Sequence, residues 1–290
     1  MTPAVKTVDI LRVGPDARAP GRDVAAAEEP LEIRLGAMPF VVIMRTPGAD
    51  RELAAGFLLS ERIVRDPSEV ASIRYCGDPS DGAADQVPPD QADVEGGDPA
   101  SGNVLGVWLR GAAAERAAAR VAERRHVTAN SSCGVCGRRS IDDLMEGVVA
   151  VASSAVVPRS TIAALPDRLR AVQEVFDLTG GLHAAGLFGL DAELEGVAED
   201  VGRHNAVDKV LGAELLRGHL PLADRVLFVS GRTSFEIVQK AVVAGVPVVA
   251  SVSAPSSLAI ALAREAGVTL LGFVRDGSFN VYTGAERIAL

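Results

Sequence analysis

Residues 225–274 read RVLFVSGRTSFEIVQKAVVAGVPVVASVSAPSSLAIALAREAGVTLLGFV, and this stretch decides the fold. Three apolar runs in it have the length and β-branched composition of buried strands, namely 225–230, 246–253 and 268–274. Amphipathic segments with helical spacing separate these runs, namely 234–244 and 256–266. Because parallel strands need covering crossovers, the alternation predicts a sheet with helices packed on its faces.

The same pattern extends upstream. A helix predicted over Thr161–Phe176 precedes two strands, 183–190 and 196–201, which a turn at Asp191-Ala192 joins. A further helix follows Gly202 and ends near Arg217. The sequence therefore predicts an α/β fold, a three-layer α/β/α mixed sheet over residues 151–290.

The first half of the chain predicts a smaller α+β domain over residues 30–150, preceded by a flexible arm at 1–29 that shows no clear period. Its expected elements are a hairpin at 31–48 that turns at Gly36-Ala37, a helix at 50–62 with Asp50 as N-cap, strands near Ile73 and at 104–109, and a helix at 112–125. Between the two strands, residues 77–103 hold seven acidic residues and no basic one. That composition cannot form a packed core, so it predicts a disordered insertion.

Composition excludes several classes of protein. The net charge of −9 disfavours general nucleic-acid binding. No apolar run reaches the roughly 18 residues that a membrane helix needs, and the N-terminus lacks the pattern of a secretory signal. We therefore expect a cytoplasmic protein without nucleic-acid or membrane partners.

A Cys-Gly-Val-Cys motif lies in the polar loop 126–139 and carries Cys133 and Cys136. Residues 116–139 contain six arginines and one acidic residue, and nearby cations favour the nucleophilic thiolate. A structural zinc site would need about four ligands, of which only His126 and the more distant Cys76 could supplement the pair. A thioredoxin-like redox pair normally follows a strand, whereas this loop follows a predicted helix. Sulfur transfer is therefore the favoured interpretation, and we expect no permanent metal.

The predicted strand ends carry a second set of candidate residues. Ligands of open α/β sheets bind at the carboxyl ends of strands, where helix N-termini suit phosphate groups. Two such loops supply Gly202, Arg203, His204 and Asn205, and Ser230, Gly231, Arg232 and Thr233, while a third spans 253–257. Taken singly, each loop is explained by turns and helix capping alone, but three loops at one edge favour a nucleotide-like ligand. His183 is balanced between a structural role and a role in the site.

Six segments together resemble the FdhD family of formate dehydrogenase accessory proteins: MRTPGADRELAAGFLLSERI, SSCGVCG, TGGLHAAG, EDVGRHNAVDKV, SGRTSFEIVQKA and GFVRDGSFNVYTG. The resemblance covers the chain from about Glu29 to its end, apart from the acidic insertion. It implies a sulfurtransferase that accepts persulfide sulfur from a cysteine desulfurase. The sulfur then passes to the molybdenum or tungsten bis-molybdopterin guanine dinucleotide of formate dehydrogenase.

The resemblance also implies roles for particular residues. Cys133 would carry the persulfide, with Cys136 assisting. The cofactor would lie against Phe273, Val274, Arg275, Asp276, Gly277 and Ser278. The larger domain would resemble cytidine deaminase, and the protein would form a homodimer. Deaminase chemistry is not expected, because two alanines follow His183 and the deaminase zinc motifs are absent.

Two alternatives stay open. A non-catalytic chaperone would bind the cofactor and use the cysteines only as a clip. A zinc-site protein would hold metal through the same cysteines.

Overall fold

A computed structural model describes residues 4–75, 102–124 and 149–290. The largest element is a six-stranded mixed sheet with the strand order β13-β12-β11-β10-β8-β9. Strands β10, β11 and β12 are parallel, whereas β8 runs antiparallel to β10 and to β9. The bounds are β8 His183–Gly189, β9 Leu194–Asp200, β10 Arg225–Val229, β11 Val248–Ser251, β12 Thr269–Arg275 and β13 Ser278–Thr283. The predicted mixed sheet is thus confirmed, while β13 was not predicted.

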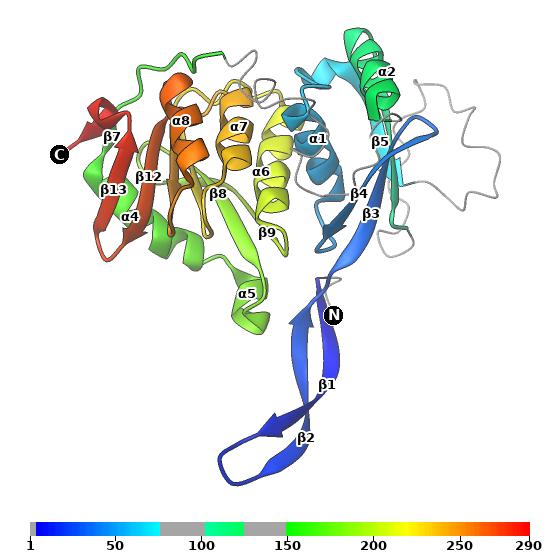
Figure 1. Cartoon of the computed structure of the whole chain (residues 1–290), viewed down its shortest axis with the longest axis vertical. Coiled ribbons are helices and arrows are strands. Elements are labelled where there is room, and N and C mark those ends of the chain that lie inside the picture. Colours follow the sequence, from blue (N-terminus) through cyan, green and yellow to red (C-terminus); the bar gives the residue numbers. More distant parts are fainter. Residues whose placement is uncertain (1–3, 76–101, 125–148) are drawn as a thin grey trace.

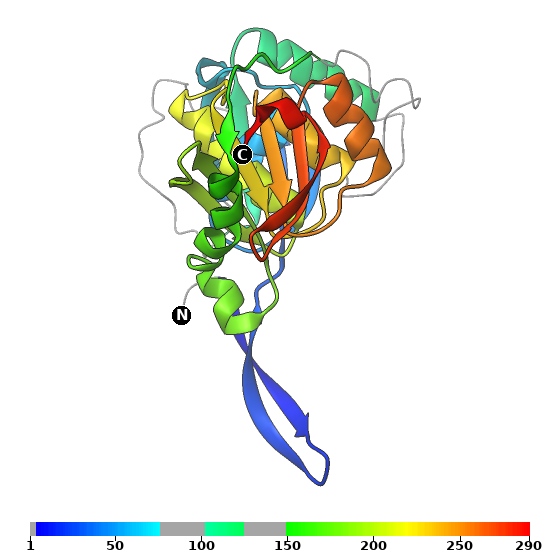
Figure 2. The same cartoon turned by 90° about the vertical axis from the view of Figure 1, so that its left-hand side faces the viewer.

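Helices cover both faces of this sheet (Figure 2). One face packs against α6 (Arg203–Arg217), α7 (Phe235–Val243) and α8 (Ser257–Glu265), and the other against α4 (Arg159–Arg170). Consecutive strand residues point to opposite faces, so Leu227 lies in the first hydrophobic cluster and Phe228 in the second. The likeness to cytidine deaminase stays a prediction.

The helix predicted over 161–176 is two helices, so that prediction is wrong. After α4 the chain bends at 171–173, and α5 (Glu174–Thr179) follows. The carboxylate of Glu199, on β9, accepts hydrogen bonds from the backbone N–H groups of Val175 and Phe176, both at 2.9 Å. A carboxylate at this position stabilises the start of α5 and explains why a second helix begins there.

The N-terminal part holds a four-stranded sheet with the order β4-β3-β6-β5. Its bounds are β3 Glu29–Leu35, β4 Met38–Arg45, β5 Val70–Tyr75 and β6 Val104–Leu109, and its helices are α1 Asp50–Ser60 and α2 Ala112–Arg124. A short helical turn lies at Pro67–Glu69. The predicted hairpin, strands and α2 are confirmed within about three residues. Far along the chain, β7 (Val157–Pro158) pairs with β14 (Ile288–Ala289), which follows a helical turn at Ala285–Arg287.

Helix α1 packs directly on α6, so one hydrophobic cluster spans both parts of the chain (Figure 1). Glycines allow the close approach. A Cβ atom on Gly56 would lie 1.9 Å from the carbonyl oxygen of Asp208, and one on Gly212 would lie 1.9 Å from that of Glu52. Side chains at these positions would therefore push the two helices apart.

Asp50 does not cap α1, which corrects a second prediction. Ala49 is the N-cap, in a left-handed conformation, and no side chain caps the helix there. The Asp50 carboxylate instead accepts bonds from Arg45 Nε at 3.0 Å, Arg45 Nη2 at 2.8 Å and the Tyr75 hydroxyl at 2.8 Å. Arg45 is fully buried, and a buried guanidinium requires such a partner.

The N-terminal residues form a β-ribbon of β1 (Val5–Val13) and β2 (Arg18–Ala26), which projects from the body (Figure 1). The expectation that regular structure begins near Pro30 is therefore wrong. Both faces of the distal ribbon are exposed, so no apolar alternation marks it in the sequence.

Several predictions fall outside the described residues. These are the Cys133 and Cys136 loop and all but Gly102 and Asn103 of the acidic insertion. Asn103 accepts a hydrogen bond from Arg45 Nη2 at 3.1 Å, so the insertion ends before it. In the described part of the chain, no helix is both long and apolar enough to cross a membrane.

Candidate functional site

Four loops meet at one edge of the large sheet, and each contacts the next. His204 Nε2, after β9, lies 2.9 Å from Ser234 Oγ, after β10. The Thr233 N–H donates to the Ala254 carbonyl at 3.3 Å, and the Ser256 N–H donates back to Thr233 at 3.0 Å. The Phe273 N–H, near the end of β12, donates to the Ser253 carbonyl at 3.2 Å. The structure thus brings the predicted strand-end residues into one row, here called the strand-end edge.

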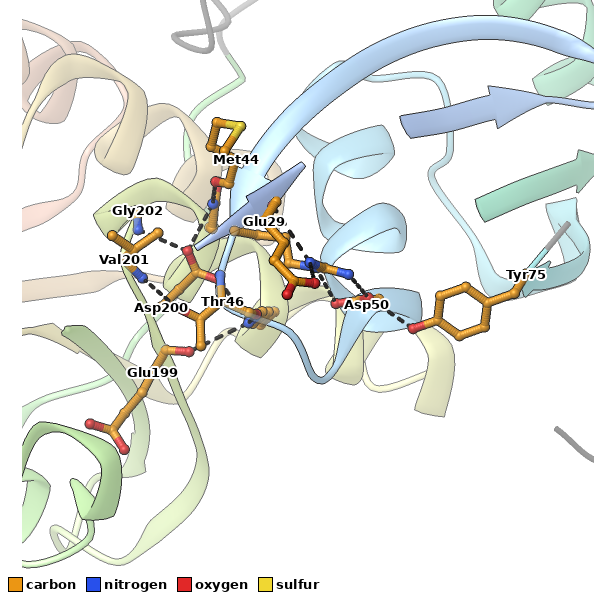
Figure 3. A network of polar contacts seen from close by, with 12 residues as sticks. Glu29, Met44, Thr46, Asp50, Tyr75, Glu199, Asp200, Val201 and Gly202 are labelled. Carbon is orange, nitrogen blue, oxygen red and sulfur yellow. Dashed lines mark hydrogen bonds and ion pairs between the residues drawn. The ribbon is translucent and has the colours of Figure 1, made fainter. Parts of the chain in front are cut away.

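The loop after β9 is organised by Asp200, whose side chain is fully buried (Figure 3). Its carboxylate accepts bonds from the Gly202 N–H and from Asn205 Nδ2, both at 2.8 Å. Lys209 Nζ lies 2.7 Å from the other carboxylate oxygen and is equally buried. This ion pair fixes the loop that carries Arg203 and His204.

The N-terminal part reinforces that loop through the segment after β4 (Figure 3). The Thr46 N–H donates to the Asp200 carboxylate at 3.1 Å, and the Thr46 hydroxyl accepts a hydrogen bond from the Val201 N–H at 3.2 Å. Asn205 Nδ2 also donates to the Met44 carbonyl at 2.8 Å. The amide nitrogen of Asn205 is thus used inside the protein, and this predicted ligand residue has a structural role.

Sequence reasoning missed Thr46, Asp200 and Lys209. The signals were weak: an acidic residue at the end of a strand, and a lysine on the buried side of a helix. The contact between residues 46 and 200 depends on the tertiary fold and leaves no local pattern.

The loop after β10 shapes the start of β8. Ser230 Oγ accepts a hydrogen bond from the Ala184 N–H at 2.9 Å. A Cβ atom on Gly231 would lie 3.2 Å from His183 Nδ1 and 3.8 Å from Arg203 Cδ, so glycine lets both side chains pass. Two of the predicted ligand residues, Ser230 and Gly231, therefore hold a third candidate, His183, in place.

Two arginines of these loops form no ion pair with the described acidic residues. Among the described residues, neither Arg203 nor Arg232 has an ion-pair partner, and Arg203 Nε is buried without a hydrogen bond. Thr233, only 1% exposed, likewise has an Oγ1 without a partner in the described residues. Buried polar atoms are normally paired, so these atoms point to a ligand with anionic oxygens.

Both histidines of the edge are constrained. Burial, together with the charges of Arg203, His204 and Arg232, lowers the pKa of His183. His204 Nε2 lies 2.9 Å from both Ser234 Oγ and Glu236 Oε2, at the start of α7. Sequence reasoning missed Ser234 and Glu236 as partners of His204.

The segment Phe273–Ser278 comprises the end of β12, the turn at Asp276-Gly277 and the first residue of β13. Asp276 and Gly277 both have positive φ angles, and Ser278 Oγ donates to the Arg275 carbonyl at 3.0 Å. Arg159 Nη2 donates to the Gly277 carbonyl at 2.8 Å. The Arg275 guanidinium lies over the Phe273 ring, 5.8 Å from its centroid.

Val274 differs from its neighbours in this segment. Its side chain is fully buried in the hydrophobic cluster on the α4 face, because strand alternation turns it away from solvent. A contact between Val274 and a cofactor would therefore be made by its backbone, and the predicted place of Val274 in the cofactor-binding segment stays a prediction.

Comparison with known proteins shows which family the sequence matches. A model of the FdhD/NarQ family matches residues 26–289. The chain belongs to the FdhD/NarQ family. Its FdhD relatives include proteins named sulfur carrier protein FdhD from Streptomyces coelicolor, Anaeromyxobacter dehalogenans and Mycobacterium tuberculosis. They are 48%, 49% and 46% identical to it, with alignments that cover 97%, 93% and 92% of this chain and 94%, 90% and 92% of theirs.

The FdhD/NarQ assignment agrees with a solved structure. A protein from Desulfotalea psychrophila, described as a formate dehydrogenase accessory protein, superposes with a TM-score of 0.73 over 99% of this chain and 100% of that one. At 24% identity, this likeness shows a shared fold. Within the described residues, no three His, Cys, Asp or Glu side chains cluster as a metal site would require.

Proposed function

We propose that this protein is a sulfur carrier for formate dehydrogenase, and that it transfers persulfide sulfur to the enzyme's bis-molybdopterin guanine dinucleotide. The relatives named sulfur carrier proteins, at 46% to 49% identity over nearly the whole chain, support the first half of the proposal. The second half rests on the strand-end edge and on the two cysteines.

The strand-end edge carries the proposal for the substrate. Arg203 and Arg232 have no ion-pair partner among the described residues, and the buried Arg203 Nε and Thr233 Oγ1 have no hydrogen bond there. A guanine dinucleotide brings diphosphate oxygens, which accept charge-assisted bonds from guanidinium groups. The Phe273 ring beside the β12–β13 turn offers a stacking surface for a base.

The first chemical step is a thiol–persulfide exchange at Cys133. The Cys133 thiolate attacks the outer sulfur of the desulfurase persulfide, and a new S–S bond forms on Cys133. The S–S bond of the desulfurase breaks, and its cysteine leaves as a thiolate, so no net oxidation occurs. The arginines around the motif favour the thiolate state of the attacking group.

The second step delivers sulfur to the metal of the bound substrate. Transfer as sulfide requires two electrons, and the Cys136 thiolate supplies them by attacking the inner sulfur, Cys133 Sγ. The outer sulfur leaves as hydrosulfide, and a Cys133–Cys136 disulfide remains. A cellular dithiol then reduces this disulfide.

The test of the carrier role is mass spectrometry after incubation with a cysteine desulfurase and cysteine. The wild type is expected to gain one sulfur on Cys133, and Cys133→Ala to gain none. Cys136→Ser is expected to hold the persulfide yet to deliver it only when an external dithiol is added. Normal persulfide yield on Cys133→Ala together with normal activation of the dehydrogenase would refute the carrier role.

A cofactor-binding chaperone is the second candidate. Arg203 and Arg232, the two arginines of the strand-end edge, come from segments other than the cysteine loop, as a chaperone that binds cofactor without its cysteines would need. Full activation of formate dehydrogenase by a variant with Cys133→Ser and Cys136→Ser would favour the chaperone over the carrier.

The same proposal includes a cytoplasmic location and a homodimer. Light scattering of the purified protein measures the mass in solution, and a monomer at micromolar concentration would remove the dimer from the proposal.

A further inference from the structure

His183 lies near the two arginines of the strand-end edge, Arg203 and Arg232. It begins β8, where it pairs across the sheet with Asp200 of β9, and its ring lies against the backbone of Gly231. The charged groups that face it are Asp200, Arg203 and His204 around the start of α6, and Arg232 in the loop after β10. Charged groups from two neighbouring segments therefore surround this imidazole.

The imidazole of His183 is not committed to a structural bond. Unlike His204 and His219, it has no hydrogen-bond partner among the described residues. Asp200, an acidic group of the described residues that acts on this ring, is already paired with Lys209 at 2.7 Å. The half-buried His183 ring and the buried Arg203 Nε, both without a hydrogen-bond partner in the described residues, are therefore available to bind a ligand.

We infer that His183 is a ligand-contacting residue: with Arg203 and Arg232 it binds the diphosphate of the substrate, through a hydrogen bond from its imidazole ring. The inference rests on the proposed function, because it assumes that the strand-end edge receives the nucleotide part of the cofactor. No role for His183 follows from the family match itself.

The charge state of the His183 imidazole determines what the ring adds to binding. The diphosphate bridge of a dinucleotide carries two negative charges, and Arg203 and Arg232 supply two positive ones. A neutral N–H group adds a directional hydrogen bond without a third charge. Burial and the surrounding cations hold the pKa of His183 low, which keeps the ring in this state near neutral pH. Since a bound anion stabilises the protonated imidazole, binding is expected to raise that pKa and to strengthen at acidic pH.

The binding test measures the affinity of the full chain for two probes, inorganic pyrophosphate and guanosine diphosphate, by titration calorimetry. His183→Ala is expected to weaken pyrophosphate binding about tenfold, as loss of one hydrogen bond to a charged group does. His183→Gln retains an N–H donor and is expected to recover part of the loss. The matched control is His219→Gln, at the end of α6, where His219 Nδ1 is 2.8 Å from Glu214 and the side chain is exposed.

A second measurement does not depend on any variant being folded. The ring proton resonance of His183 in the wild type, assigned through the backbone by triple-resonance NMR, is followed from acidic to neutral pH. Pyrophosphate is expected to shift the resonance and to raise the midpoint of its titration. A purely structural histidine would keep the same midpoint with and without pyrophosphate, and that result would overturn the inference.

The outcomes separate this inference from the proposed function. If His183→Ala binds pyrophosphate like the wild type while Arg203→Gln does not, His183 is no ligand contact and the anion site stands. If the wild type binds neither probe, the inference and the proposed substrate site both fall. The persulfide assay on Cys133 then decides sulfur carriage separately.

Discussion

The loop after β9 and the turn between β12 and β13 lie at the same edge of the sheet and are expected to bind the same substrate, yet they are held differently. The loop is fixed by the buried pair of Asp200 and Lys209 and by Thr46 from the N-terminal part. The end of β12 and the turn after it have positive φ angles at Phe273 and Asp276, and the turn is held by exposed hydrogen bonds such as that from Arg159 to the Gly277 carbonyl. From this difference we propose that the loop after β9 binds the charged diphosphate as a rigid site, and that the less firmly held end of β12 adjusts to the base.

The largest expected effect is a loss of stability when the buried ion pair that fixes the loop after β9 is removed. Lys209→Met leaves Asp200 buried without its cation, which is expected to cost about 3–5 kcal/mol in the free energy of unfolding. Lys6→Met is the matched control, because Lys6 pairs with Glu29 at 2.7 Å but is 56% exposed. That control is expected to cost about 1 kcal/mol or less. Urea denaturation measures both, and equal losses would contradict a buried network at the site.

The second effect concerns anion binding. Arg203→Gln removes the guanidinium that the rigid loop presents, and a charge-assisted bond contributes about 1.5–3 kcal/mol. We expect about ten- to hundredfold weaker binding of guanosine diphosphate. Arg275→Gln, on the exposed turn, is the comparison and is expected to lose much less. Titration calorimetry measures both, and a larger loss for Arg275→Gln would reverse the proposed division of roles.

The third effect tests the adjustable side. Phe273 has a φ angle of 54°, in the region where a side chain costs about 1–2 kcal/mol. Phe273→Gly is therefore expected to be more stable than Phe273→Ala by about 1 kcal/mol, the reverse of the usual order in strands. Both variants lose the ring, so both are expected to weaken guanosine diphosphate more than pyrophosphate. Thermal unfolding in parallel with calorimetry measures the two effects, and a more stable alanine variant would show that the backbone is not strained there.

The smallest effect is a dependence of stability on pH. The folded-state pKa of His183 lies below its unfolded value of about 6.5, so the unfolded chain binds the proton first as pH falls. This group therefore contributes stability that is fully present above the unfolded pKa and is lost as pH falls towards the folded pKa. His183→Gln is expected to flatten that part of the curve of unfolding free energy against pH. An unchanged slope would mean that the ring titrates as it does in the unfolded chain.

Local patterns predicted most elements of the large sheet but not their long-range contacts. The apolar runs at 225–230 and 268–274 lie within a residue or two of β10 and β12, since buried parallel strands leave continuous apolar segments. Strand β13 was missed although Asp276-Gly277 is a strong hairpin signal. The ribbon β1–β2 was missed because its distal faces are exposed and show no apolar alternation.

The candidate site shows the same limit. Arg203, Arg232 and Thr233 were predicted from their place at strand ends, and the structure brings them to one edge. The residues that fix this edge come from far along the chain, as Thr46 and Asp200 show. The burial of the Val274 side chain was not predicted either, because motif resemblance does not show which side of a strand a residue faces.

The most direct test of sulfur carriage is a single transfer of labelled sulfur. The protein is loaded with ³⁴S from labelled cysteine by a desulfurase, freed of that enzyme, and mixed with inactive formate dehydrogenase and its cofactor. We predict that label leaves Cys133 and appears as acid-labile sulfide in the dehydrogenase in proportion to the activity gained, and that Arg203→Gln keeps its label. Activation without transfer of label would contradict the account and identify the protein as a chaperone.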